Sequence, residues 1–506
     1  MVATRSDVGF RSARGPILIS LMLTTGLVAI DSTIIATAVP SVVRDLGGFS
    51  QFPWLFSVYL LAQAVSVPIY GKLADLFGRK PVMLWGIGLF LLGSVLCGAA
   101  WSMPALIAFR AVQGLGAGAV QPMSLTIAGD IYSTAERGLI QGYIASVWGV
   151  SSVVGPTLGG LFAEYLTWRW IFFVNVPLCA VAVWMLVRSF HEKVERRPHT
   201  LDYTGAALLT AGCTLVILGL LEGGEAWAWA SPAGVGVPVA GALLIAVFVL
   251  VERRAVEPVL PLWVFRRRML VACCLVGLGV GAVLIGLTSY VPTYAQGVLG
   301  VGPLVAGFAL AMLTIGWPVT ASQSGKVYLR VGFRTTAIVG SAVVVAGTAA
   351  VALVTLWPSL VGIGTACFVV GAGFGFVAAP TLIAAQSTVG WAERGVVTAA
   401  NMFSRSIGSA VGVALFGAIA NATLRSTGPT AAGLTHASRH VFVAVLVFAV
   451  AMGCAVLLMP RRLVEAAEAV TADPSAAEAD VAAADAVAAG EPLAVPPVEA
   501  AVHKGL

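Results

Sequence analysis

The sequence predicts an all-α membrane protein built as a bundle of fourteen transmembrane helices. Three observations carry this fold class. The chain of 506 residues is 59% hydrophobic and only 10% charged, whereas a soluble domain is about 25% charged because charge covers its surface. Apolar stretches about 20 residues long, enough to cross the hydrocarbon layer as helices, recur along most of the chain. Lys and Arg residues gather in alternate connecting segments.

The apolar stretches follow one another with short connections. In lipid every backbone N–H and C=O group needs a partner within the protein, so each stretch is expected to form a helix. An even number of such helices places both ends of the chain on one side of the membrane. The predicted spans are 16–38, 53–72, 81–100, 104–127, 139–162, 169–189, 203–222, 233–252, 269–292, 304–323, 335–356, 359–385, 395–420 and 440–459.

The distribution of basic residues sets the orientation of these spans. With the N-terminus in the cytoplasm, 23 of the 29 Lys and Arg residues fall in cytoplasmic segments, four in external loops, and two, Arg110 and Arg405, inside spans. Cytoplasmic segments of membrane proteins carry such an excess. The net charge of +6 therefore reflects topology. Because the basic residues are scattered over short loops, nucleic acid is not an expected partner.

The two ends of the chain and several classes of chemistry are interpreted more briefly. Residues 1–15 are expected to be cytoplasmic, and 461–506 to form a disordered, Ala-rich, acidic cytoplasmic tail. All seven cysteines lie in apolar spans, so no external disulfide framework is predicted. His436 and His440 are interpreted as a solvated helix end rather than a metal site. We find no phosphate-binding loop, ligand cluster or nucleophile motif, and we expect no enzyme activity, metal or cofactor.

An internal repeat divides the bundle. The segment "YGKLADLFGRK" (70–80) matches "SGKVYLRVGFR" (324–334), and "GLGAGAVQP" with "AERG" (114–138) matches "GAGFGFVAAP" with "AERG" (371–395). The two offsets, 254 and 257 residues, agree on one duplication. The repeated unit holds six spans, 16–189 and again 269–460, with two inserted spans at 203–252. Six is even, so both copies keep the same orientation and form parallel repeats, as in the two halves of major facilitator transporters.

The chain resembles the major facilitator superfamily, and within it the fourteen-helix drug:proton antiporters. The resemblance covers about residues 16–460. It is carried by "AIDSTIIATAVPSV" (29–42), "GKLADLFGRKPV" (71–82), "FRAVQGLGAGA" (109–119) and "WGVSSVVGPTLGG" (148–160). This resemblance implies two pseudo-symmetric six-helix halves around a central cavity, with two linker helices between them.

The first candidate site is a cytoplasmic gating loop between spans 2 and 3. Its glycines allow close backbone approach, Asp75 is suited to accept hydrogen bonds at a helix N-terminus, and Arg79 is expected to pair with Asp130. The family resemblance implies that Asp75 meets the N-terminus of span 13 and latches the halves in an outward-facing state, although a basic loop that merely fixes topology is the alternative. In the second copy Leu329 and Phe333 replace Asp75 and Arg79. The residues of this loop site are Gly71, Asp75, Gly78, Arg79, Lys80 and Asp130.

The second candidate site is the Gly-rich fifth span. Small residues let helices pack closely in lipid, and a proline removes a hydrogen bond from the helix, which offers a hinge. By resemblance this is the antiporter motif of the family, whereas a packing face alone is the alternative. Its residues are Gly149, Gly155, Pro156, Gly159 and Gly160.

The third candidate site is built on Asp31, the only acid well within an apolar span. Intramembrane acids often mark proton relays, and we place Asp31 in the outer half of span 1 as the proton-coupling group. A structural carboxylate pinned by Ser32 and Thr33 is the alternative. Arg110 is expected to face the central cavity beside this acid, unless it extends to the membrane surface. Gln113 lies one turn further on the same face.

Two further polar groups are possible cavity residues. Arg405 lies about ten residues inside span 13 and needs an anion or several carbonyl groups as partners. Glu222 ends span 7 on the outer side.

The resulting expectation is a proton-driven exporter of hydrophobic or amphipathic small molecules, such as drugs or antibiotics. The partners are then the substrate, protons and the bilayer, and the chain is expected to be monomeric in a bacterial plasma membrane. The rarity of Lys (five against 24 Arg) indicates a GC-rich bacterial genome. Export or flipping of a lipid or other endogenous metabolite, proton-coupled uptake, and a non-transport role remain the alternatives.

Overall fold

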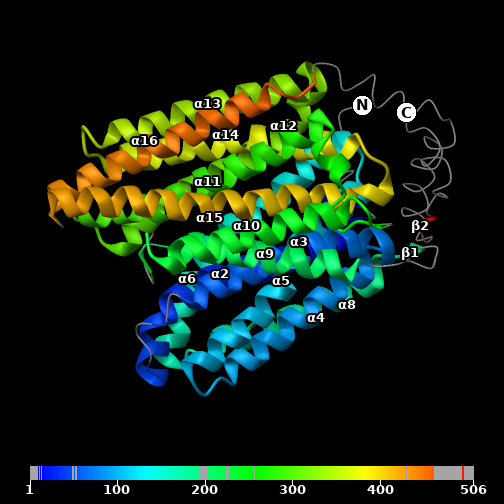
Figure 1. Cartoon of the computed structure of the whole chain (residues 1–506), viewed down its shortest axis with the longest axis horizontal. Helices are drawn as coiled ribbons and strands as arrows, with labels where there is room; N and C mark the ends of the chain where they lie inside the picture. Colours follow the sequence, from blue (N-terminus) through cyan, green and yellow to red (C-terminus); the bar gives the residue numbers. More distant parts are fainter. Residues whose placement is uncertain are drawn as a thin grey trace.

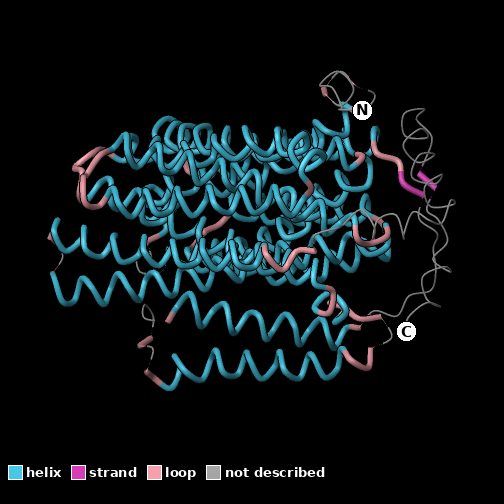
Figure 2. The backbone as a smooth tube through the Cα atoms, turned by 90° about the horizontal axis from the view of Figure 1, so that it is seen from above, coloured by secondary structure: helices cyan, strands magenta, loops and turns pink. Residues whose placement is uncertain are grey.

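The structure is a computed structural model that describes residues 9–460, except for 11, 13, 48–50, 52, 53, 194–201, 224–226, 229, 256 and 429, and also residues 493 and 494. In this part of the chain, fourteen helices are long and apolar enough to cross a membrane. The predicted fold class is therefore confirmed. Figures 1 and 2 show the helices packed side by side along one direction. The predicted tail 461–506 lies outside the described residues, apart from two positions.

Each predicted span corresponds to one helix, except that the sixth is formed by two. The first six spans are α2 (Gly15–Leu46), α3 (Trp54–Phe77), α4 (Arg79–Gly98), α5 (Met103–Ile131), α6 (Thr134–Tyr165), and α7 (Trp170–Phe173) with α8 (Asn175–Ser189). The inserted spans are α9 (Tyr203–Glu222) and α10 (Pro232–Glu252). The last six are α11 (Arg268–Gly297), α12 (Pro303–Val331), α13 (Phe333–Val354), α14 (Leu360–Ser387), α15 (Arg394–Thr427) and α16 (Ala431–Val456).

Few other regular elements are described. Short 3₁₀ turns, η2 (Leu262–Phe265) and η3 (Trp391–Glu393), precede α11 and α15. The two-residue strands β1 (Glu192–Lys193) and β2 (Leu493–Ala494) pair in parallel. We call the end of the bundle at which α2 begins and α16 ends the terminal end, and the opposite end the far end.

Several helices extend beyond the apolar stretches that predicted them. The first helix continues to Leu46 instead of ending at 38, and α16 begins at Ala431 instead of 440. Hydropathy marks only the segment inside the hydrocarbon layer, whereas backbone hydrogen bonding carries a helix on into the polar layer. The predicted loop between spans 53–72 and 81–100 is also corrected. Here α3 and α4 are separated by the single residue Gly78, which turns the chain with a φ of 94°, a conformation that glycine adopts without steric cost.

The duplicated segments meet crosswise between the two halves. A Cβ atom added at Gly71 of α3 would lie 3.0 Å from the Gly395 carbonyl oxygen at the start of α15. The equivalent glycines of the repeat, Gly325 of α12 and Gly138 of α6, also touch, since a Cβ at Gly138 would lie 2.5 Å from the Gly325 nitrogen. Each half thus places one glycine of each pair at the contact, an arrangement consistent with the predicted division into six, two and six helices.

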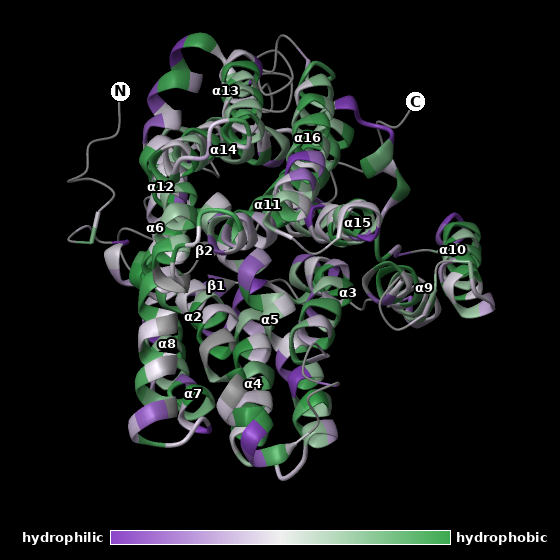
Figure 3. Cartoon of the chain, turned by 90° about the vertical axis from the view of Figure 1, so that its left-hand side faces the viewer, coloured by the Kyte–Doolittle hydropathy of each residue, from purple (hydrophilic) through white to green (hydrophobic). Residues whose placement is uncertain are grey.

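The inserted helices lie beside the bundle. Figure 3 shows α9 next to α3 and α15, with α10 outside α9. Glycines join the pair closely, because a Cβ at Gly241 would lie 2.8 Å from the Gly212 carbonyl oxygen. The outer helix α10 exposes a row of apolar side chains that includes Val239 and Leu243. Such a face suits contact with lipid.

Candidate functional site

An ion pair between Asp31 and Arg110 lies inside the bundle formed by the first six spans. Asp31 is at the middle of the 32-residue α2, and Arg110 lies two turns into α5. The Arg110 Nη1 atom is 2.6 Å from Asp31 Oδ2, and each side chain is 1% exposed. Arg110 also donates from Nε to the Leu55 carbonyl at 3.2 Å, and its guanidinium lies 4.0 Å from the centre of the Tyr59 ring. Arg110 therefore points inward and does not extend to the membrane surface.

Gln113 completes the set of partners around Asp31. Its Nε2 donates to Asp31 Oδ1 at 2.7 Å, and its Oε1 accepts from Arg110 at 2.8 Å. Both Asp31 oxygens are thus occupied by partners from α5. In the alternative interpretation, the hydroxyls of Ser32 and Thr33 hold Asp31. In the structure both hydroxyls instead donate to backbone carbonyls of their own helix.

Two residues that the sequence analysis missed extend this polar network. Ser94 of α4 accepts hydrogen bonds from Gln113 at 3.3 Å and from Asn175 of α8 at 2.9 Å. Its own hydroxyl donates to the Phe172 carbonyl at 2.9 Å. Asn175 Oδ1 is buried and has no hydrogen-bond partner among the described residues. Polar side chains inside spans 3 and 6 were the available signal, because burying them without hydrogen bonds is costly.

The position of this network bears on two expectations. Asp31 lies beyond the middle of the apolar part of α2, Gly15–Ile35, in agreement with the outer half of span 1. The pair is enclosed among α2, α3 and α5, and both side chains are 1% exposed, so in this structure it does not face an open cavity. Exchange of a proton with water therefore requires a different arrangement of these helices.

At the terminal end, Asp75 binds the N-terminus of α15. Its Oδ1 accepts from the Gly395 N–H at 2.9 Å, and its Oδ2 accepts from the Val396 N–H at 2.8 Å. These N–H groups lack partners within their own helix, and the helix dipole favours an anion there. The structure therefore has the expected contact between the first half and the start of span 13. Whether it acts as a latch stays a prediction.

Arg79 and Asp130 extend the same contact region. The Arg79 Nε donates to Asp130 Oδ2 at 2.9 Å, as expected from the sequence, and Nη2 is 3.1 Å from Asp75. Two partners from the second half were not foreseen. The Arg79 guanidinium lies 3.5 Å from the centre of the Trp391 ring, and Arg394 donates to Asp130 Oδ1 at 3.2 Å. Acidic and basic side chains thus alternate in the buried interface between the two halves.

Of the remaining gating-loop residues, Gly71 contacts the start of α15, whereas Lys80 acts within the first half. The Lys80 ammonium donates to the Val187 carbonyl at 2.9 Å, near the end of α8. Glu192 accepts from the Arg79 and Lys80 N–H groups, each at 3.0 Å, and so caps α4. Burial raises the pKa of the Glu192 carboxyl above its usual value. In the second copy, Leu329 is exposed and Phe333 stacks on Tyr328, so these two positions do not reproduce the ion pair of Asp75 with Arg79.

The Gly-rich motif is a packing surface on a continuous helix. A Cβ at Gly149 would lie 3.2 Å from the Thr314 carbonyl of α12, and one at Gly155 would lie 2.0 Å from Thr33 Oγ1 of α2. Gly159 is buried, whereas Gly160 has open space beside it. The helix α6 runs on through Pro156, and whether this proline acts as a hinge stays a prediction.

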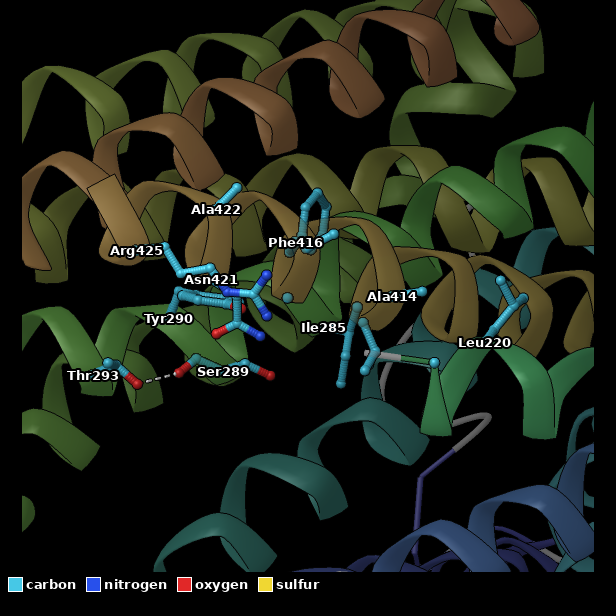
Figure 4. A pocket seen from close by; sticks show the side chains of 14 residues that line it. Leu220, Ile285, Ser289, Tyr290, Thr293, Ala414, Phe416, Asn421, Ala422 and Arg425 are labelled. Carbon is cyan, nitrogen blue, oxygen red and sulfur yellow. Dashed lines mark hydrogen bonds between the residues drawn. The ribbon is translucent and has the colours of Figure 1, made fainter. Parts of the chain in front are cut away.

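A cavity of about 410 Å³ lies between α9, α11 and α15 in the far half of the bundle. Figure 4 shows Arg425, Asn421 and Tyr290 at one end, with Ile285 and Leu220 at the other. The cavity is thus polar toward the far end and apolar toward the interior. Glu222 is buried next to a cavity residue, Gly223, and does not itself line the space.

Arg405 lies deeper on α15 than this cavity. Its guanidinium is 5.3 Å from the centre of the Trp317 ring of α12. Within the described residues, no acidic side chain forms an ion pair with it. The partner that the sequence left unnamed is therefore an aromatic ring, which attracts a cation through its electron-rich face.

Comparisons with known proteins agree with this architecture. The model of the Major Facilitator Superfamily matches residues 21–413. Multidrug transporter protein MdtP of Bacillus subtilis is 33% identical over 417 residues, covering 82% of this chain and 77% of the relative. Multidrug resistance protein 3 of the same species is 33% identical over 403 residues, covering 80% and 79%.

Solved structures share the fold at low sequence identity. The human organic anion transporter MFSD10 (TETRAN) has a TM-score of 0.61 at 15% identity, covering 86% of this chain and 99% of that one. The proton:xylose symporter XylE has a TM-score of 0.60 at 14% identity, covering 90% and 98%. These two likenesses concern the fold alone.

Proposed function

This chain belongs to the major facilitator superfamily, and we propose that it exports hydrophobic or amphipathic small molecules from a bacterial cell in exchange for protons. Two relatives bear names of multidrug transport or resistance, which supports drug-like substrates. Transport then follows alternating access, in which the two halves rock around a site near the bilayer midplane.

The closed terminal end is the observation that carries this proposal. Asp75 accepts hydrogen bonds from the start of α15, and Asp130 binds arginines from both halves. The cavity between α9, α11 and α15 lies in the opposite, far half. With the terminal end in the cytoplasm, as the basic residues indicate, this arrangement corresponds to a transporter shut toward the cell interior.

We assign proton coupling to Asp31. A proton on Asp31 removes the charge that holds Arg110 and weakens their hydrogen-bonded pair, which favours separation of α2 from α5. Loss of the proton to the cytoplasm restores the pair. Each charge that moves inward gains about 2.3 kcal/mol per 100 mV, which is a sufficient driving force for export against a gradient.

Everted membrane vesicles from a host that lacks its own pumps test this proposal. An acid-inside pH gradient should drive accumulation of a lipophilic dye, and a protonophore should abolish it. Asp31→Asn should remove gradient-dependent accumulation, Asp31→Glu should retain part of it, and Asp45→Asn, an exposed acid on the same helix, should leave it unchanged.

The same vesicles separate the alternatives. Dye that leaves the acid-inside vesicles together with protons indicates a symporter and refutes antiport. Accumulation that is unaffected by Asp31→Asn refutes the assignment of coupling to this residue. Purified chain in liposomes that moves no dye under any gradient refutes drug export.

A further inference from the structure

The cavity between α9, α11 and α15 has the chemistry of an amphipathic site. Its inner part is formed by Leu220, Ile285 and Phe416, and its outer part by Asn421 and Arg425. Among the described residues that line it, Arg425 is the single charged side chain. A ligand with an apolar body and an anionic head matches this distribution of polarity and charge.

Arg425 is available to bind such a head. The side chain is exposed, and in the described part of the chain it has neither an ion-pair partner nor a hydrogen-bond partner. Figure 4 shows its guanidinium beside Asn421 and Tyr290. A guanidinium presents several N–H donors in a planar fork that fits carboxylate, sulfonate or phosphate oxygens.

A second cation lies deeper on the same helix. Arg405 is 20 residues before Arg425, about 30 Å along the helix axis at 1.5 Å per residue. It is half-buried and contacts the Trp317 ring. Twenty residues turn an α-helix by about 200°, so Arg405 lies on the side of α15 that faces α12, away from the cavity.

The Asp31 carboxylate inside the bundle is already bound. Both oxygens of Asp31 have partners, Arg110 and Gln113, and the carboxylate is 1% exposed. A cationic drug therefore finds no exposed carboxylate at Asp31 in this arrangement, whereas an anion finds Arg425 at the cavity.

We propose that the substrates of this transporter are amphipathic anions, held with the apolar body between α9, α11 and α15 and the anionic head at Arg425. This inference rests on the proposed export function and specifies its substrate class. Arg425 recognises the head group by its negative charge and by the planar arrangement of its own N–H donors. The apolar body is bound with little shape specificity.

Three matched fluorescent probes test the proposal. They carry one fluorophore and one alkyl chain and end in a sulfonate, a neutral sulfonamide or a trimethylammonium group, so that a pH gradient does not change their charge. Everted vesicles containing the full chain should accumulate the sulfonate at least about ten times faster than the ammonium compound, the scale on which charge complementarity selects partners.

Variants of Arg425 locate the effect. Arg425→Gln should reduce sulfonate accumulation about ten-fold and change the neutral probe less than about two-fold. Arg425→Lys keeps the charge and should retain part of the sulfonate transport, which separates loss of charge from misfolding. Arg439→Gln removes an exposed arginine at the far end of α16, outside the cavity, and should leave all three probes unchanged.

The outcomes are distinguishable from failure of the export function. Equal or faster accumulation of the ammonium probe, or an unchanged preference in Arg425→Gln, overturns the anionic substrate class while export stands. No gradient-dependent movement of any probe overturns export itself. An anionic phospholipid that copurifies with the wild type and is lost in Arg425→Gln, with unchanged probe preference, identifies a resident lipid and also overturns the proposal.

Discussion

Asp31 and Arg110 face each other across α2 and α5 at 2.6 Å, and Gln113 bonds to both. The pair is buried, so neither charge is screened by water. Removing one partner from a buried pair leaves the other charge uncompensated, which destabilises a protein by about 3–5 kcal/mol. The residue assigned to proton coupling is therefore also a structural element, and the two roles need separate tests.

Asp31→Asn should lower stability because it leaves the Arg110 guanidinium buried without a counter-charge. We expect a loss of about 3–5 kcal/mol, and a smaller loss in the double variant Asp31→Asn with Arg110→Gln, in which no charge remains. Thermal unfolding in detergent measures both. If the single and double variants melt alike, the pair does not contribute as an ion pair. Transport should be absent from both.

Gly71→Ala should open the terminal end. The added Cβ would lie 2.3 Å from the Ala399 Cβ and 3.0 Å from the Gly395 carbonyl oxygen, and overpacking of this kind costs about 1–3 kcal/mol. Hydrogen exchange followed by mass spectrometry should show about ten-fold faster exchange in the peptide 391–400. Gly88→Ala is the control, because a Cβ there meets nothing within 4 Å. Unchanged exchange in Gly71→Ala would show that α3 does not hold α15.

Ser94→Ala should destabilise the first half without touching the ion pair. The hydroxyl accepts from Gln113 and Asn175 and donates to the Phe172 carbonyl, so its loss leaves buried polar groups unpaired at a cost of about 1–3 kcal/mol. Ser146→Ala serves as the control, since that hydroxyl donates to the Tyr143 carbonyl of its own helix turn. Equal melting temperatures of the two variants would contradict a network centred on Ser94.

Asp45→Asn should have a small effect on stability that depends on pH. Hydrogen bonds from Arg169 and Trp168 lower the pKa of the Asp45 carboxyl below its usual value of 3.8. A lowered pKa means stabilisation that is present above this usual value and is lost as the pH falls through the lower value in the folded state. Because the side chain is about half exposed, we expect at most about 1 kcal/mol.

Melting curves of the wild type and Asp45→Asn, recorded from neutral pH downward, measure this effect. The two curves should differ near neutral pH and converge in acid. A difference that grows as the pH falls would contradict the assigned direction.

The sequence predicted which segments form helices, but it did not predict where some of these helices begin and end. The apolar stretches predicted fourteen spans, and each is present in the described chain. The extension of α2 to Leu46 and the near-continuous passage from α3 to α4 through Gly78 were missed. Hydropathy reports burial in hydrocarbon, and both missed features lie in the polar layer, where backbone hydrogen bonds alone continue a helix.

For the candidate site, the sequence identified charged residues whose burial would be costly, and the structure supplied their partners. Asp31, Arg110 and Arg405 stand out in apolar spans because a charge there is unfavourable. Which groups meet depends on how the helices rotate and cross. That is why Ser94, Asn175, Trp391 and Arg394, from distant segments, escaped sequence reasoning.

The sequence by itself determined that the chain forms a membrane bundle with a duplicated six-span unit, because hydrophobicity and repetition are properties of local segments. The tertiary structure decided that Asp31 is enclosed with Arg110, that Asp75 caps α15, and that Arg425 lines a cavity. Those facts depend on packing between helices, where distances of a few ångströms separate a paired charge from an available one.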